Sequence, residues 1–345
     1  MLLVLISAIR TKGVLMTNVF EQQPNSGVTT AKFSWQSLTP GYLCLSPMCG
    51  VTDSAYRQIS KKHGADVVFT EMASANMLLA APHRNEAYLH YEEWERPIIC
   101  QLMGGDPETM VKAARLVESL GFDGIDVNMG CPEKKIVGNA CGSSLLKHPD
   151  TAVRIVDAMA NATTLPISVK MRSGFQAGSS VQPEFALRMQ AAGAQALAIH
   201  PRTKEQGYKG AADWSITKQI VEAVQIPVGG SGDVTDRDAI ARLRHETGVT
   251  GIWVARGAMG NPWIFDPTRT QPPTLEEVVQ TVFEHARLVL ELKGPHGIVE
   301  LRKHLTWYFN GFPGAAALRE ACKTVSTYDD IVRLIDQHLG LDVAA

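Results

Sequence analysis

The chain has 345 residues, 45% of them hydrophobic and 20% charged, with a formal net charge of −2 at pH 7. This composition is that of an ordinary globular protein, and the charge excludes a general electrostatic attraction to nucleic acid, so a polyanionic partner must be held by a local patch. The six cysteines include no Cys-x-x-Cys pair, so neither a zinc ribbon nor a disulfide framework is indicated. We therefore expect no metal site and a reducing, cytoplasmic location.

The N-terminal segment begins with a short apolar run. Residues 1–6 read MLLVLI, but no basic segment precedes them and the run is too short to cross a bilayer. We therefore expect no cleaved signal and no membrane association. Met1 and Met16 are both candidates for the biological start, and residues 1–40 are interpreted as an N-terminal extension without fixed structure.

Eight short β-prone segments follow, each succeeded by a helix-like stretch. Near-continuous apolar segments such as 251–255 (GIWVA) are typical of strands in a parallel sheet that is covered on both faces. The eight ranges are 42–47, 66–70, 97–102, 124–128, 167–171, 196–200, 227–230 and 251–255. Their number and total length predict a (β/α)8 TIM barrel. A doubly wound sheet is the alternative, but no Gly-x-Gly-x-x-Gly motif follows the first segment.

The pattern between and beyond these strands is helical. Residues 107–120 and 183–192 are predicted helices, and Asp106 followed by Pro107 is a typical N-cap and first-turn pair. After a polar, Pro-rich linker, the last part of the chain has the periodicity of several amphipathic helices and contains no strand pattern. We predict three parts, namely the extension 1–40, a catalytic barrel 41–268 and an all-α domain 269–345.

Cys131 is the most informative residue, because it lies where the segment 124–128 runs into a Gly-Cys-Pro turn. In a barrel of this kind the carboxyl ends of the strands form the mouth where catalysis takes place. A single thiol there can act as an acid, a base or a nucleophile, whereas most cysteines elsewhere are small packing residues. We therefore predict that Cys131 is catalytic.

The last two strands end in turns that are typical of phosphate binding. Residues 230–233 (GSGD) and 255–257 (ARG) offer backbone N–H groups and a guanidinium where barrels commonly bind phosphate. A ligand anchored there extends toward Lys170, whose charge at the end of a buried strand needs an anionic or electron-rich partner. FMN has this shape and chemistry. The predicted FMN-binding residues are Pro47, Met48, Cys49, Gln101, Asn128, Lys170, His200, Gly230, Ser231, Gly232, Asp233, Ala255 and Arg256.

Seven segments, in this order, together resemble the tRNA-dihydrouridine synthases, and among these the bacterial B-type enzymes. The segments are 46–53 (SPMCGVTD), 101–104 (QLMG), 126–132 (DVNMGCP), 169–174 (VKMRSG), 200–203 (HPRT), 255–257 (ARG) and 302–308 (RKHLTWY), the last resembling the start of that family's helical tRNA-binding domain. Three positions depart from the family, which has Gly at Pro201, Asn at Ser231 and Gly at Ala255. Pro201 has no backbone N–H to donate.

The resemblance implies the reduction of a specific uridine in tRNA to 5,6-dihydrouridine, with NADPH as reductant. It further implies that flavin N5 supplies a hydride to C6 and that Cys131 supplies the proton to C5. A thiol is mostly protonated at neutral pH, so it can donate without special tuning. The protein is expected to act as a monomer.

Binding of tRNA requires phosphate contacts. Residues 271–345 contain seven Lys and Arg against ten Asp and Glu, so a broad basic surface is not expected there. A local patch on the helical domain is predicted instead. The predicted substrate-binding residues are Arg172, Arg202, Arg302, Lys303, His304 and Lys323.

Two other functions are compatible with the sequence. One is an FMN-dependent oxidoreductase of a free pyrimidine or another small metabolite, similar in its barrel to dihydroorotate dehydrogenase. The other is a catalytically silent RNA-binding flavoprotein. Loss of turnover on removal of the helical domain distinguishes the tRNA enzyme from the first, and loss of product in Cys131→Ala distinguishes it from the second.

Overall fold

The computed structural model describes residues 32–81, 85–178, 183–312 and 315–339. Most of the expected N-terminal extension, with both candidate start residues, lies outside the described residues. The described end of that extension has a fixed place, because residues 33–40 pack against the barrel. Trp35 is 1% exposed and its ring stacks on Trp253 at 5.6 Å and on Phe69 at 6.2 Å, so this large apolar side chain fixes the segment.

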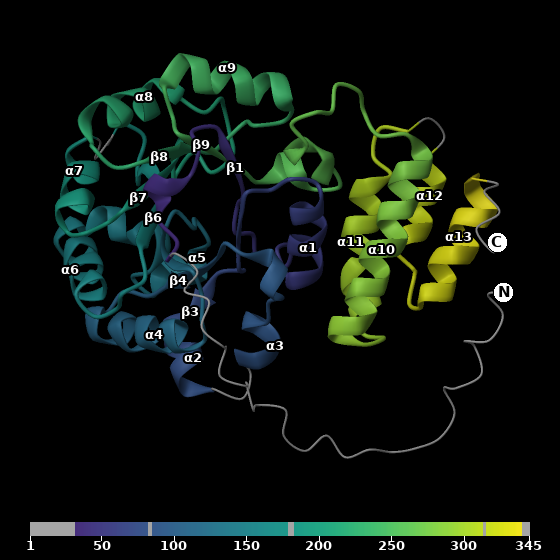
Figure 1. Ribbon diagram of the computed structural model, residues 1–345, viewed down its shortest axis with the longest axis horizontal. Helices are drawn as coiled ribbons and strands as arrows, with labels where there is room; N and C mark the ends of the chain where they lie inside the picture. Colours follow the sequence, from purple (N-terminus) through teal and green to yellow (C-terminus); the bar gives the residue numbers. More distant parts are fainter. Residues whose placement is uncertain (1–31, 82–84, 179–182, 313–314, 340–345) are drawn as a thin grey trace. The chain divides into compact units, whose positions relative to one another are not determined.

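A closed ring of eight parallel strands forms the barrel (Figure 1). The strands are β1 Tyr42–Leu45, β2 Val67–Phe69, β4 Ile98–Met103, β5 Gly124–Met129, β6 Ile167–Gly174, β7 Ala196–Thr203, β8 Val228–Gly230 and β9 Gly251–Val254, with the short β3 Ala73–Ser74 continuing β2 along β4. Pairing of β1 with β9 and of β2 with β4 closes the ring. The predicted TIM barrel and all eight of its strands are thereby confirmed, while the doubly wound alternative is not.

Helices surround this ring because each connection returns to the start of the next parallel strand. The main ones are α1 Ser54–Lys62, α4 Pro107–Ser119, α6 Pro149–Ala160, α7 Glu184–Ala191, α8 Trp214–Ala223 and α9 Arg237–Thr247, with the shorter α2 Ala75–Ala80, α3 Asn85–Leu89 and α5 Lys134–Gly138. The predicted helices at 107–120 and 183–192 are confirmed as α4 and α7. The Asp106 side chain accepts a hydrogen bond from the backbone N–H of Thr109 at 2.8 Å, as an N-cap does.

Within the described residues four helices follow the barrel, where the periodicity predicted several. They are α10 Leu275–Lys293, α11 Gly297–Tyr308, α12 Ala315–Cys322 and α13 Tyr328–Leu339. Thr274 and Glu277 form a capping box at the start of α10. Helix α10 lies beside α1 of the barrel, and Phe33–Ala345 is one compact unit (Figure 1).

The contact between α1 and the C-terminal helices is an aromatic cluster. The ring of Tyr56 in α1 lies 5.5 Å from His285 of α10 and 4.9 Å from His304 of α11. All three side chains are at most 2% exposed. The barrel therefore shares its core with the helices that follow it. Among the described residues, no helix has the length and apolar character needed to cross a membrane.

Candidate functional site

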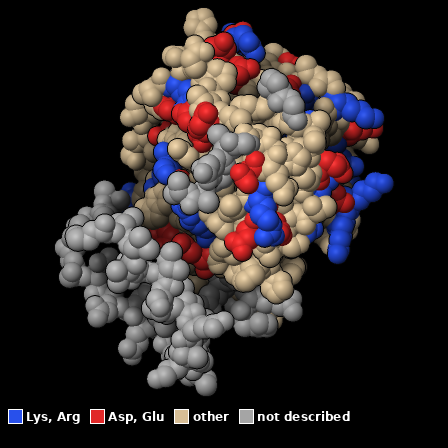
Figure 2. Space-filling model, turned by 90° about the vertical axis from the view of Figure 1, so that its right-hand side faces the viewer, with Lys and Arg blue, Asp and Glu red and all other residues tan. Residues whose placement is uncertain are grey.

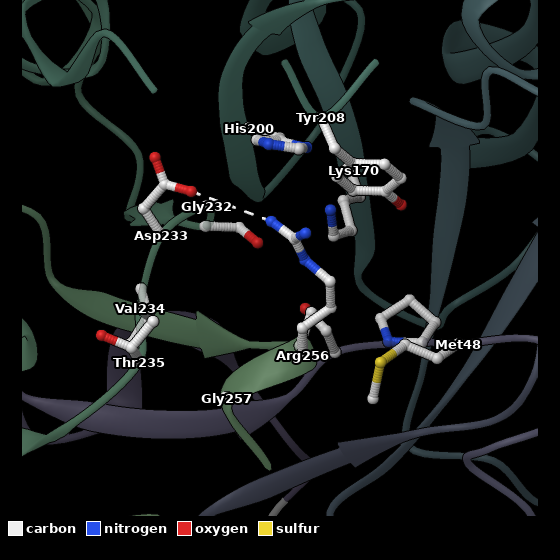
Figure 3. A pocket seen from close by; sticks show the side chains of 14 residues that line it. Met48, Lys170, His200, Tyr208, Gly232, Asp233, Val234, Thr235, Arg256 and Gly257 are labelled. Carbon is white, nitrogen blue, oxygen red and sulfur yellow. Dashed lines mark ion pairs between the residues drawn. The ribbon is translucent and has the colours of Figure 1, made fainter. Parts of the chain in front are cut away.

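A cavity of about 510 Å³ opens at the carboxyl ends of β6, β7, β8, β9 and β1 (Figure 3). This is the end at which barrel proteins bind their ligands. Most of the predicted FMN-binding residues line it: Pro47, Met48, Lys170, His200, Ser231, Gly232, Asp233, Ala255 and Arg256. Gly257, in the predicted phosphate turn 255–257, also lines the cavity. The sequence analysis did not select the other lining residues, Ser46, Tyr208, Val234 and Thr235.

The two turns predicted to bind phosphate are packed tightly at this cavity. A Cβ atom on Gly232, whose φ is +108°, would lie 2.7 Å from Cδ2 of His200. A Cβ atom on Gly257 would lie 2.1 Å from the backbone oxygen of Val234, so the turn after β9 rests directly on the turn after β8. Only glycine fits at these positions, and both glycines are among the residues that line the cavity.

Charged groups are concentrated beside these turns. One Arg202 Nη atom lies 2.6 Å from an Asp233 carboxylate oxygen, and an Arg256 Nη atom lies 3.8 Å from the other oxygen, as Figure 3 shows for Arg256. The Nε atom of Arg202 is buried and has no hydrogen-bond partner within the described part of the chain. Two guanidinium groups therefore share one carboxylate, which leaves this end of the cavity suited to an anion.

His200 contributes a neutral ring to the cavity. Burial, together with the neighbouring charges of Lys170, Arg172 and Arg202, lowers the pKa of His200 to about 2. Its Nε2 atom lies 3.3 Å from an Arg202 Nη atom, and an arginine can only donate. The proton of the neutral ring is therefore on Nδ1, which can donate a hydrogen bond to a ligand.

Lys170 brings an ammonium group to the cavity from the end of β6. Burial lowers its pKa to about 8, against the opposing effect of the Asp126 carboxylate. At neutral pH the group is still mostly charged. This outcome fits the expectation that Lys170 faces an anionic or electron-rich partner.

Tyr208 is a cavity residue that sequence reasoning missed. It lies in the loop after β7, is 57% exposed, and its ring centroid is 4.4 Å from the guanidinium carbon of Arg256 and 5.6 Å from that of Arg172. The aromatic ring thus lies beside two guanidinium groups, and Figure 3 shows the one that lines the cavity, Arg256. The available signal was an aromatic residue soon after a strand end, but no periodicity marks such a loop.

Four of the predicted FMN-binding residues do not line the cavity. Gln101 and Asn128 are buried, 1% and 9% exposed, and are hydrogen-bonded to each other at 2.8 Å. A Cβ atom on Gly230 would lie 2.1 Å from the ring of Trp214, so this glycine permits helix packing. Cys49 is exposed in the loop after β1.

Cys131 follows β5 directly, at the barrel mouth. Its backbone N–H donates to Oδ1 of Asn128 at 3.0 Å, and its backbone oxygen accepts from the N–H of Ser143 at 3.1 Å. The side chain is half-buried, and this burial raises the pKa of the thiol above its usual value. The sulfur is therefore held in its protonated form at neutral pH, which is the form that a proton donor needs.

Arg172 and Arg202, two predicted substrate-binding residues, lie within the barrel mouth and are each 2% exposed. Arg172 donates to the backbone oxygens of Gly130 at 2.8 Å and Thr203 at 3.0 Å. It therefore ties the turn that carries Cys131 to the end of β7.

The structure does not bring the four predicted basic residues of the helices together, which differs from the expected patch. Arg302 donates to the backbone oxygen of Val325 at 2.5 Å. The Nζ atom of Lys303 points to the barrel mouth, 3.4 Å from the position of a Cβ on Gly50. His304 is buried, 2% exposed, and Lys323 is an exposed residue paired with Glu320 at 2.5 Å.

The cavity fits the expected FMN on its chemistry. An anionic group is matched by Arg256 and by the two glycine turns, which all line the cavity. The Lys170 ammonium lines the same cavity and suits the electron-rich part of such a ligand. The donors are thus spread along the cavity rather than gathered at one point.

These features define the chain as a (β/α)8-barrel protein with a cavity lined by cationic side chains at the mouth of the barrel and a thiol at the same end. A solved structure of 2-naphthoyl-CoA reductase shares this fold, with a TM-score of 0.50, 11% identity and coverage of 68% of this chain and 50% of that one.

Sequence comparisons are more specific. The model of the dihydrouridine synthase (Dus) family matches residues 44–341, and the chain belongs to this family. It is 35% identical to probable tRNA-dihydrouridine synthase 1 of Synechocystis sp. over 94% of both chains. It is also 35% identical to tRNA-dihydrouridine synthase B of Pseudomonas aeruginosa, over 81% of this chain and 87% of that protein.

Proposed function

We propose that this protein reduces a specific uridine in tRNA to 5,6-dihydrouridine, with FMN as bound cofactor and NADPH as reductant. The observation that carries the proposal is the combination, at one barrel mouth, of a cavity for an anionic ligand and a protonated thiol on the adjoining turn. Membership of the dihydrouridine synthase family supports the same reaction.

In this proposal the residues at the turns after β8 and β9 would hold the phosphate of FMN, and Lys170 would supply a positive charge for its electron-rich part. FMN, when bound, supplies the hydride for the C6 position of the uracil. Arg256 and the N–H of His200 Nδ1 contribute donors, and Asp233 holds Arg202 in place through a 2.6 Å ion pair. These side chains bind and orient, and none of them has to change its protonation state.

Cys131 is proposed to donate the proton to C5 of the uracil. Its raised pKa keeps the thiol protonated until the proton is needed. The uridine must leave the RNA stack to reach this residue, at a cost of a few kcal/mol. That cost is offset by contacts to the phosphate backbone elsewhere on the protein.

We place part of the tRNA contact on the rim of the barrel. Lys147 and Lys204 each hold an ammonium near the ring of Phe175, at 4.6 and 5.1 Å from its centroid, and neither forms an ion pair with a carboxylate of the described residues. Lys303 reaches the opposite side of the mouth from α11. On the face shown in Figure 2, by contrast, basic and acidic side chains are interspersed.

The proposal has three further parts. Residues 41–268 form the catalytic domain and residues 269–345 the tRNA-binding domain. The protein acts as a monomer. It works in the cytoplasm, where a free thiol stays reduced.

The test uses purified protein, NADPH and a tRNA transcript without modifications. We expect FMN to be retained after purification or reconstitution, and dihydrouridine to be detected by mass spectrometry of the nucleosides. Cys131→Ala is expected to keep the flavin and lose product formation by about a hundredfold or more. Cys141→Ala, a nearby buried cysteine, is the matched control. A protein that stays colourless on reconstitution contradicts the proposal, as does full activity of Cys131→Ala.

A rim contact is tested with the double change Lys147→Ala and Lys204→Ala. We expect a several-fold higher KM for tRNA and an unchanged rate of flavin reduction by NADPH, because two phosphate contacts are lost. Lys218→Ala, an exposed lysine in α8, is the control. If the protein instead acts on a small metabolite, the double change should not alter the KM for that metabolite. The same variant therefore distinguishes a tRNA enzyme from a small-metabolite oxidoreductase.

A further inference from the structure

A buried chain of hydrogen bonds runs beneath the mouth of the barrel. It joins three polar residues on neighbouring strands: Gln101 on β4, and Asp126 and Asn128 on β5. Gln101 stands opposite Asp126 in the register of β4 and β5, and side chains two apart on one strand face the same way. Asp126 is 0% exposed, so no solvent competes for these bonds.

The bonds follow one another without a gap. Gln101 Nε2 donates to Oδ2 of Asp126 at 2.7 Å, and Asn128 Nδ2 donates to Oε1 of Gln101 at 2.8 Å. Oδ1 of Asn128 then accepts from the backbone N–H of Gly130 at 3.1 Å and of Cys131 at 3.0 Å. A carboxylate buried below is thus connected to the turn that carries the thiol.

The direction of every bond in this chain is dictated by its two ends. An ionised carboxylate only accepts, and a backbone N–H only donates. Rotating the amide of either Gln101 or Asn128 by half a turn would therefore place two donors or two acceptors face to face. Burial raises the pKa of Asp126 to about 6, although bonds from Gln101 and Ser168 and the charge of Lys170 oppose this, so the group is mostly ionised at pH 7.5.

We infer that Asp126 is a positioning residue, which fixes the orientation of the Gln101 and Asn128 amides and through them the backbone of Cys131. Asp126 does not touch the cavity itself. Its action on catalysis rests on the proposed function of Cys131, but its action on the Cys131 turn does not.

The test is Asp126→Asn. This change keeps the size of the side chain but replaces a carboxylate, which can only accept hydrogen bonds, by an amide, which can also donate them. Hydrogen–deuterium exchange of the peptide that contains Gly130 and Cys131 is measured in the flavin-loaded protein. We expect exchange about tenfold faster or more, because the bonds from both backbone groups to Asn128 are weakened. In the turnover assay kcat is expected to fall about tenfold, with KM for tRNA within about twofold.

Ser168→Ala is the matched control. Ser168 donates to the other oxygen of Asp126 at the same 2.7 Å, but it is not in the path to Cys131. Equal acceleration of exchange in both variants indicates general loosening and overturns the inference, and so does unchanged exchange in Asp126→Asn. If Asp126→Asn does not fold, Gln101→Met is used instead, because it interrupts the same series of hydrogen bonds. Wild-type exchange rates at the Cys131 turn in Gln101→Met would then refute the positioning role of Asp126.

The two proposals fail in different ways. If the protein makes no dihydrouridine but exchange at the turn still responds to Asp126→Asn alone, the proposed function is wrong and the positioning role stands. If the enzyme is active and exchange does not respond, the positioning role is wrong and the function stands.

Discussion

The Nζ atom of Lys293 lies 2.6 Å from Oδ2 of Asp53, so the last residue of α10 is paired with the N-cap of α1. This pair is one of the polar links between the barrel and the C-terminal helices. Burial by itself raises the pKa of Asp53, but the charge of Lys293 and the hydrogen bonds outweigh it and lower that pKa to about 2.

Lys293→Gln is expected to lower the free energy of unfolding by about 1–2 kcal/mol, because a partly buried carboxylate loses its partner. The matched control is Lys62→Gln, which removes an exposed pair to Glu284 between the same two helices and is expected to cost less than about 0.5 kcal/mol. Urea denaturation at pH 7 measures both. Equal losses would contradict a special role for Asp53.

The sign of the pH effect follows from the lowered pKa. The stabilisation is present above the unfolded value of 3.8 and is lost as the pH falls through about 2. The difference between wild type and Lys293→Gln is therefore expected to shrink at low pH.

His285 and His304 lie in the contact between α1 and the C-terminal helices, and they give the stability of the protein a second dependence on pH. Their ring centroids are 4.8 Å apart, and burial lowers the pKa of His285 to about 4 and that of His304 well below 6.5. Both are neutral when folded and take up protons when unfolded. Stability is therefore complete above pH 6.5 and decreases as the pH falls from there toward the folded pKa values.

His304→Phe removes one of these groups while keeping an aromatic ring. Between pH 8 and pH 5 we expect its stability to fall by about 2 kcal/mol less than that of wild type. Denaturation curves at the two pH values provide the measurement. A parallel decline of both proteins would show that His304 does not titrate with unfolding.

The sequence was sufficient to predict the barrel because its strands are buried on both faces. Such strands have continuous apolar patterns, and each ends in polar or small residues. The polar residues at these strand ends also predicted the cavity residues Lys170 and Arg256. The packed segment around Trp35 was not predictable in this way, because a 3₁₀ helix of three residues has no periodicity.

The basic residues of α11 show what a sequence pattern cannot resolve. Arg302, Lys303 and His304 are consecutive, and consecutive helix positions point about 100° apart. They therefore reach the loop before α13, the barrel mouth and the buried cluster respectively, and do not form one patch. Their roles depend on where the helix docks, which is a tertiary property.

The ring of Tyr208 is expected to help hold the cations of the cavity. Tyr208→Ala should weaken FMN binding by about two- to fivefold, because a cation–π contact at an exposed site contributes about 0.5–1 kcal/mol. Tyr208→Phe keeps the ring and should bind FMN like wild type. Titration of the flavin-free protein, followed by quenching of flavin fluorescence, gives the affinities. A loss in Tyr208→Phe equal to that in Tyr208→Ala would assign the effect to the hydroxyl group instead.

Gly257 is expected to be indispensable for the phosphate end of the cavity. A methyl group there would lie 2.1 Å from the backbone oxygen of Val234, which cannot move as a flexible side chain does. Gly257→Ala must therefore push apart the turns after β8 and β9, and we expect a loss of about 2 kcal/mol or more in stability together with weaker FMN binding. Gly138→Ala is the control, since nothing lies within 4 Å of its Cβ position and alanine favours the helix α5. Thermal unfolding of both variants with and without FMN measures the effect. If FMN raises the Tm of Gly257→Ala as much as that of wild type, the close contact between the two turns does not determine the shape of the phosphate site.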